Sequence, residues 1–202
     1  MQLILQCSCL DDYVQELPEV NFSDASIQAL SNKLFYTGQS DIEKIECAFH
    51  FVRDHIAHSW DIQGRKVTRT ASEVLVHQQG VCYAKSNLLA ALLRGQGIPT
   101  GFCYQRLMLF DTPEKGYALH ALNAVFVRHL NKWIRLDARG NKRGVEAEFS
   151  LNEEKLAFVV NTALGEIDYD TIFVKPNVKT METLRRCDDA LTMYMEYLPD
   201  TL

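Results

Sequence analysis

The sequence has no run of apolar residues that approaches the roughly 18 needed for a helix to cross a membrane. It also has no excess of basic residues, since 21 Lys and Arg stand against 26 Asp and Glu, for a formal net charge of −5. Proteins that bind a phosphate backbone usually carry a basic surface. We therefore expect neither nucleic acid nor an anionic membrane as a partner.

Two further absences concern compartment and domain organisation. The apolar N-terminal residues lack a preceding basic segment and run directly into Asp11 and Asp12, so no secretory signal is expected. None of the six cysteines belongs to a Cys-x-x-Cys pair, and in a chain of 202 residues they do not indicate a disulfide framework. Free thiols and a cytoplasmic location are expected. With no internal repeat, low-complexity tract or Pro/Gly/Ser-rich linker, residues 1–202 are predicted to form a single domain.

Helical periodicity dominates the first half of the chain. Ser40 and Glu43 form a capping-box pattern, in which each side chain can accept a hydrogen bond from the backbone amide of the other residue. Apolar residues then recur at helical spacing from Ile42 to Ile56. We expect helices over 23–35, from 40 to about 56, from 70 until Gly80, over 81–94, and over 178–197.

Strand-like segments follow Pro99, which ends the fourth helix. Alternation of residue types predicts strands over 102–110, 120–127, 133–137 and 171–174. The polar residues 128–132 are expected to form a hairpin loop. Helices followed by an antiparallel sheet predict an α+β fold, with the 81–94 helix packed on the sheet.

Cys82 differs from the other cysteines because it directly precedes an apolar helix. Its thiol is expected in the first turn, where unpaired amides and the helix dipole favour a thiolate. The same amides can bind a developing oxyanion. Position alone fits a buried structural cysteine equally well.

A nucleophilic thiol needs a base, and the base needs an orienting group. His120 stands at the start of one expected strand and Asp137 at the end of its expected hairpin partner. Hairpin partners run in opposite directions, so these residues are expected to lie close together. A core histidine and a turn aspartate are the alternative.

The segment from Gly80 to Pro99 resembles the core motif of the transglutaminase-like superfamily, in which G-x-C opens the nucleophile helix and G-I-P leads into the sheet. His120-Ala121 and the segment ending at Asp137 resemble the histidine and aspartate blocks of that family. The resemblance implies a papain-like core at about 40–140, with a C-terminal extension at about 150–202. It also implies that Cys82 is the nucleophile, His120 the general base and acid, and Asp137 the residue that orients it.

The sequence departs from the family pattern near these motifs. Leu122 stands where the family often has tryptophan, and Ala138-Arg139 follow the aspartate in place of a small pair such as Pro-Thr. These differences concern the expected pocket for the acyl acceptor and the identity of the substrate. They concern the expected type of reaction less. Large cross-linking relatives carry calcium sites and extra β-domains that this chain lacks room for.

Other residues were weighed for the same site or for a metal. Gln78, Gln79 and the indole of Trp60 are candidate oxyanion donors, against a surface or packing role. Basic residues after the aspartate could bind an acidic substrate group, but a solvated loop is the favoured interpretation; these are Arg139, Lys142 and Arg143. The spacing of three histidines lacks His-x-x-x-His, so a zinc site is not expected there; these are His50, His55 and His58.

The favoured function is a cysteine-dependent enzyme that attacks a carboxamide or peptide carbonyl through a thioester, with hydrolysis favoured over cross-linking. No cofactor or metal is expected, and the expected partner is a peptide or protein-amide substrate. A non-catalytic module that binds a peptide or partner is the chief alternative, and a redox-sensing thiol protein is a third. The sequence does not indicate the substrate or the oligomeric state.

Overall fold

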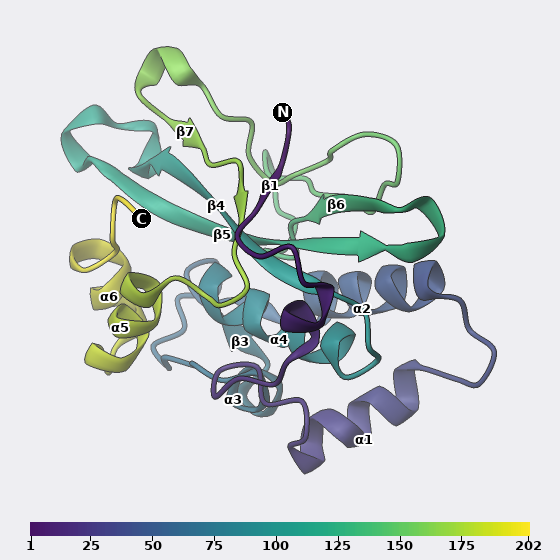
Figure 1. Ribbon diagram of the computed structural model, residues 1–202. Coiled ribbons are helices and arrows are strands. Elements are labelled where there is room, and N and C mark those ends of the chain that lie inside the picture. Colours follow the sequence, from purple (N-terminus) through teal and green to yellow (C-terminus); the bar gives the residue numbers. More distant parts are fainter.

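The computed structural model describes residues 1–202, apart from the side chain of residue 111. A helix that is buried along its whole length lies at the centre of the protein (Figure 1). This is α4 (Cys82–Arg94), and all 13 of its residues are buried. Its apolar periodicity and the expected end at Gly95 are confirmed. The start of α4 is therefore held in place by the core on every side.

Three helices pack against α4, and the second of them also contacts the sheet (Figure 1). They are α1 (Ala25–Leu34), α2 (Asp41–His55) and α3 (Ala71–His77). The predicted capping box of α2 is present: Ser40 N donates to Glu43 Oε2 at 2.8 Å, and Glu43 N donates to Ser40 Oγ at 3.3 Å. The α3 helix ends at His77, before the predicted stop at Gly80, because Gln78 adopts a left-handed conformation with φ of 51°.

Four antiparallel strands form the main sheet in the order β6-β5-β4-β7. They are β4 (Thr100–Met108), β5 (Tyr117–Val127), β6 (Lys132–Leu136) and β7 (Ile167–Asp168). The predicted hairpin is confirmed, since β5 pairs with β6 from Asn123↔Leu136 to Val127↔Lys132. Its first strand is longer than predicted, so His120 lies inside β5 and not at its start.

Two short parallel pairs were not predicted as such. One joins β2 (Ala57–His58) to β3 (Gln79–Gly80), and the other joins β1 (Ile4–Leu5) to β8 (Thr171–Ile172). Five 3₁₀ turns complete the elements: η1 (Leu10–Val14), η2 (Leu109–Asp111), η3 (Pro113–Lys115), η4 (Arg128–Leu130) and η5 (Thr162–Leu164). The mixture of helices with an antiparallel sheet confirms the α+β class.

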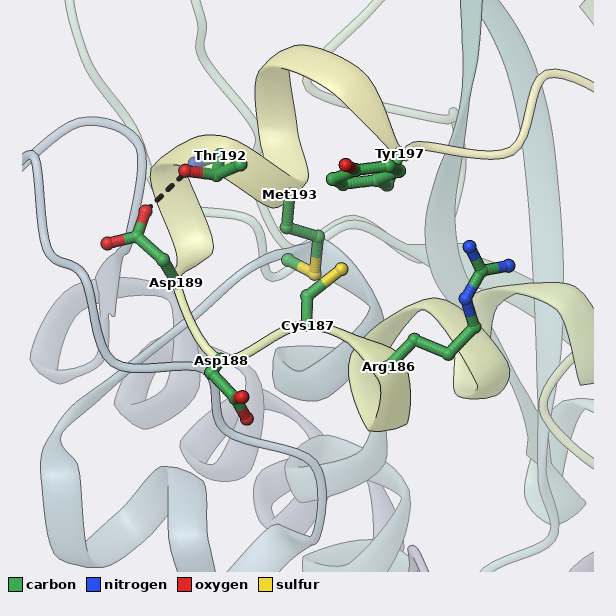
Figure 2. A pocket seen from close by; sticks show the side chains of 7 residues that line it. All are labelled: Arg186, Cys187, Asp188, Asp189, Thr192, Met193 and Tyr197. Atoms are coloured by element: carbon green, nitrogen blue, oxygen red, sulfur yellow. Dashed lines mark hydrogen bonds between the residues drawn. The ribbon is translucent and has the colours of Figure 1, made fainter.

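The prediction of one helix over 178–197 is wrong. The chain forms α5 (Val178–Arg186) and α6 (Ala190–Glu196), which lie together beside the sheet (Figure 1). The break occurs because Asp189 takes an extended conformation and its carboxylate accepts from Leu191 N and Thr192 N, which caps α6 (Figure 2). Among the residues described, no helix has both the length and the apolar character that a membrane span requires.

Candidate active site

Cys82 is the first residue of α4 and is 9% exposed. Val81 precedes it in an extended conformation, and no side chain caps this helix. The first amides of the helix are therefore free of a side-chain cap at the position where a carbonyl oxygen could be bound. Gly80 is required by space, because a Cβ there would lie 3.0 Å from Thr68 Oγ1 and 3.2 Å from Ala84 Cβ.

The structure brings His120 and Asp137 together. Nε2 of His120 lies 2.7 Å from Oδ2 of Asp137, and both side chains are buried. Two backbone amides also donate to the carboxylate: Arg139 N to Oδ1 at 3.2 Å and Ala157 N to Oδ2 at 3.1 Å. Burial opposes the charge of Asp137, but His120 and these amides outweigh it and lower the pKa of the carboxyl.

The same geometry leaves one imidazole nitrogen for Cys82. Because Nε2 faces Asp137, Nδ1 is the nitrogen that remains for a partner on the Cys82 side. Burial lowers the pKa of His120, yet Asp137 and then Cys82 outweigh this effect and raise it to about 10. Phe158 packs edge-on against the imidazole at 5.0 Å and restricts its rotation. This arrangement can hold a proton on His120 beside Cys82.

A cavity of about 780 Å³ opens over these residues, and Cys82 and His120 both line it. One wall is aromatic: Trp60 stacks on Tyr194 with ring centroids 4.5 Å apart, and Phe110 packs against Trp60 at 5.4 Å. A cavity with an apolar wall and a few convergent polar groups is typical of a ligand site.

The candidate oxyanion donors lie in different places. Trp60 lines the cavity, so its indole remains a candidate donor. Gln78 is exposed beyond the end of α3. Gln79 directs its amide toward Gly64, since a Cβ on that glycine would overlap Gln79 Oε1. Neither glutamine lines the cavity.

Of the three basic residues after Asp137, Lys142 and Arg143 are exposed, as expected of a solvated loop, whereas Arg139 is not. Arg139 is buried and forms a two-pronged ion pair with Asp61. Lys142 Nζ also lies 2.7 Å from Asp61 Oδ1. Two cations therefore share one carboxylate on the wall of the cavity, and Arg143 adds a third positive charge.

His58 is a residue of this site that sequence reasoning did not identify. It lines the cavity, it is 5% exposed, and among the described residues its Nδ1 has no hydrogen-bond partner. Burial, and then the charge of Arg139, hold its pKa well below the ordinary value, so the ring is neutral. His58 reaches the site because it pairs with Gly80, two residues before Cys82. No local sequence pattern indicates this pairing between short strands, so it could not be expected from the sequence.

Leu122 is fully buried against Tyr13 and Cys103 and does not line the cavity. The family departure at this position therefore does not widen the cavity. His50 packs against Phe49 and His55 stacks on Phe51. Within the described part of the chain, no group of three or more acidic, histidine or cysteine side chains could hold a metal ion.

A second cavity, of about 380 Å³, lies between α5 and α6 (Figure 2). Cys187 and Met193 point toward one another there, and Asp189 is engaged in capping α6 (Figure 2). None of Cys82, His120 and Asp137 lines it. Burial raises the pKa of Cys187, which disfavours a thiolate. The cavity over Cys82 is therefore the better candidate site.

The chain is similar to known proteins in sequence and in fold. Residues 28–138, more than half of the chain, match the family model of the transglutaminase-like superfamily. A structure described as a putative cysteine protease from Cytophaga hutchinsonii is similar with a TM-score of 0.52 and 17% identity, over 66% of this chain and 43% of that one. This likeness confirms the predicted papain-like transglutaminase fold.

A structure described as a putative protease from Parabacteroides distasonis also matches, with a TM-score of 0.44 and 17% identity, over 83% of this chain and 30% of that one. This chain thus spans less than half the length of either protein. No curated protein matches the sequence.

Proposed function

Since this chain belongs to the transglutaminase-like superfamily, we propose that it is a cysteine-dependent hydrolase that cleaves a carboxamide or peptide bond through a thioester on Cys82. The observation that carries the proposal is the 2.7 Å contact between His120 and Asp137, with Cys82 and the same imidazole lining one cavity. A protein that only binds a partner has no need of a buried charged pair aimed at a thiol.

In the first step, the thiolate of Cys82 attacks the substrate carbonyl carbon, and the carbonyl electrons move onto oxygen. The amides at the start of α4 and the indole of Trp60 are the proposed donors to that oxygen. The imidazolium of His120 then gives its proton to the leaving amine, and the C–N bond breaks. Asp137 holds the ring in place and stabilises its positive form.

In the second step, neutral His120 takes a proton from water, and the resulting hydroxide attacks the thioester. Collapse of this intermediate breaks the C–S bond, releases the carboxylic acid and restores the thiolate. Polar groups such as His58, Arg139 and Asn161 line the same cavity and give water a hydrogen-bonded route to the thioester. This supports hydrolysis over transfer to an amine.

The test uses p-nitrophenyl acetate as the acyl donor, with mass spectrometry of the peptides. We expect a burst of p-nitrophenol and an acetyl group on Cys82, and Cys82→Ala should abolish both. Cys47→Ala is the matched control, because Cys47 is a half-buried thiol whose pKa burial raises. An unchanged burst in Cys82→Ala would reject Cys82 as the nucleophile, and the absence of a burst in the wild-type protein would favour the non-catalytic binding module.

The same reaction in the presence of labelled methylamine separates the two fates of the thioester. We expect acetate as the main product and little labelled acetamide. If the amide predominates, the protein is an acyltransferase and water does not compete in its cavity.

A further inference from the structure

Residues 198–202 lie against the sheet next to the cavity, beside the start of β5 (Figure 1). Leu198 lines the same cavity as Cys82 and His120. The carbonyl of Pro199 accepts a hydrogen bond from Leu119 N at 2.7 Å, and Leu119 directly precedes His120. The C-terminal segment of the chain thus binds to the backbone of β5 beside the candidate base, in the cavity that also contains the candidate nucleophile.

The amide of Leu119 is available because β6 is shorter than β5. Successive amides of a strand point to opposite edges. Phe126 N donates to Pro99 O on the β4 side, so the odd-numbered amides, including that of Leu119, point to the β6 side. The β5–β6 pairing begins only at Asn123, so residues 117–122 have no partner in β6. This is an open sheet edge that can take an extended peptide.

At Leu119 itself, only the amide is open to a ligand. Tyr83 Oη already donates to the carbonyl of Leu119 at 2.7 Å, which leaves the amide as the group for a ligand. An incoming peptide must therefore supply a carbonyl, as Pro199 does. Because this carbonyl must lie against Leu119 N, the position of the peptide along β5 is fixed relative to His120.

A second anchor is Arg106, whose side chain stacks on Tyr117 at 3.5 Å and donates to Gly165 O at 2.8 Å. Its Nε donates to the carbonyl of Asp200 at 3.0 Å, and the guanidinium lies 3.9 Å from the Asp200 carboxylate. A guanidinium in this position recognises both a backbone carbonyl and an acidic side chain.

We propose that Leu119 N and Arg106 form a peptide-binding subsite of the active cleft, which residues 198–200 occupy in place of a ligand. The ligand is an extended peptide with an apolar residue over the cavity and an acidic residue two positions further on. That this peptide is the substrate rests on the proposed function. While residues 198–200 are bound, they compete with it.

The segment is held at the margin of the core, where Leu198 and Leu202 pack against it and are only partly buried. Beyond Asp200, the segment is held by the exposed Lys179, whose Nζ donates to Thr201 O at 3.1 Å and Leu202 O at 3.0 Å. Exposed hydrogen bonds of this kind add little net stability, because water replaces them. A peptide in solution can therefore compete for Leu119 and Arg106.

The experiment compares the full chain with a chain that ends at Tyr197, using the acetylated peptide Leu-Pro-Asp-Thr-Leu, the sequence of residues 198–202, as probe. Removal of a competitor held in place within the same chain should tighten peptide binding by at least about tenfold. Cys82 should also react faster with iodoacetamide in the shorter chain, and the peptide should slow that reaction. Replacement of Asp by Asn in the peptide, or Arg106→Gln in the shorter chain, should weaken binding roughly tenfold.

A second variant guards against misfolding of the shorter chain. Asp200→Arg in the full chain places a positive charge against Arg106 and should expel the segment, whereas Asp188→Arg makes the same charge change at an exposed residue and should not. Equal peptide affinity in Asp200→Arg and Asp188→Arg would overturn the subsite. Binding and alkylation require no turnover, so peptide binding without acylation of Cys82 would leave the subsite standing and reject the proposed function.

Discussion

At the residue scale, the state of the site depends on charges buried away from water. His120 and Asp137 are both buried, and each stabilises the charged form of the other against the cost of burial. Removal of one partner leaves the other charge without compensation, which is more costly than loss of the pair as a whole. The pH dependence of stability should therefore report this contact directly.

The Asp137→Asn variant tests whether the contact between His120 and Asp137 stabilises the fold. His120 has a pKa of about 10 in the folded protein against an ordinary 6.5, so its pairing stabilises the fold fully below pH 6.5 and is lost as pH rises through about 10. The gap in unfolding free energy between wild type and Asp137→Asn should be largest at pH 6 and shrink by on the order of 2 kcal/mol by pH 9.5. Urea unfolding at each pH measures it.

The exposed His129 provides the control for that series, since His129→Asn changes a histidine outside the site. It should show the wild-type pH dependence. A gap between wild type and Asp137→Asn that stays constant from pH 6 to 9.5 would mean that the carboxylate does not hold a proton on His120.

At the element scale, local capping sets where helices begin. Ser40 and Glu43 exchange hydrogen bonds with each other's amides at the start of α2, and the helix then packs Ile45, Phe49 and Val52 onto the core. This pattern could be identified from four residues of sequence. The break between α5 and α6 could not, because the capping by Asp189 competes with an apolar periodicity that continues through it.

Ser40→Ala should lower the unfolding free energy by about 1 kcal/mol, because one amide of the first turn loses its partner. Thr37→Ala, at an exposed position three residues earlier, should change it by less than about 0.5 kcal/mol. Thermal and urea unfolding of both variants give the comparison. Equal effects would show that the capping box does not stabilise α2.

At the scale of the whole molecule, Arg94 at the end of α4 ties distant segments together. Its fully buried guanidinium donates to Thr100 O at 2.9 and 2.7 Å, to Gln15 O at 2.9 Å and to Val174 O at 2.6 Å. It also lies over the ring of Phe102. Burial lowers its pKa to about 10, so it is still charged at neutral pH.

Arg94→Met should lower the unfolding free energy by roughly 3–5 kcal/mol, because three carbonyls lose a charged donor and no water replaces it. Arg94→Lys retains the charge but cannot reach three acceptors at once, and should cost less. Urea unfolding measures both. If Met is tolerated as well as Lys, the guanidinium does not link these segments.

The sequence by itself determined the elements that depend on near neighbours. The position of Cys82 at a helix start, the hairpin that carries His120 and Asp137, and the α+β class follow from capping, periodicity and turn residues within short windows. These rules extend over one helical turn or one strand pair. The catalytic roles of the three residues stay a proposal that the experiments above test.

Only the tertiary structure decided what surrounds those residues. His58, Tyr194 and Leu198 line one cavity although more than a hundred residues separate the first from the others, and Arg139 is buried against Asp61. Leu122 faces the core and not the cavity. Such placements depend on how all the apolar faces pack at once, because each buried group must find its partner among segments that no local pattern relates.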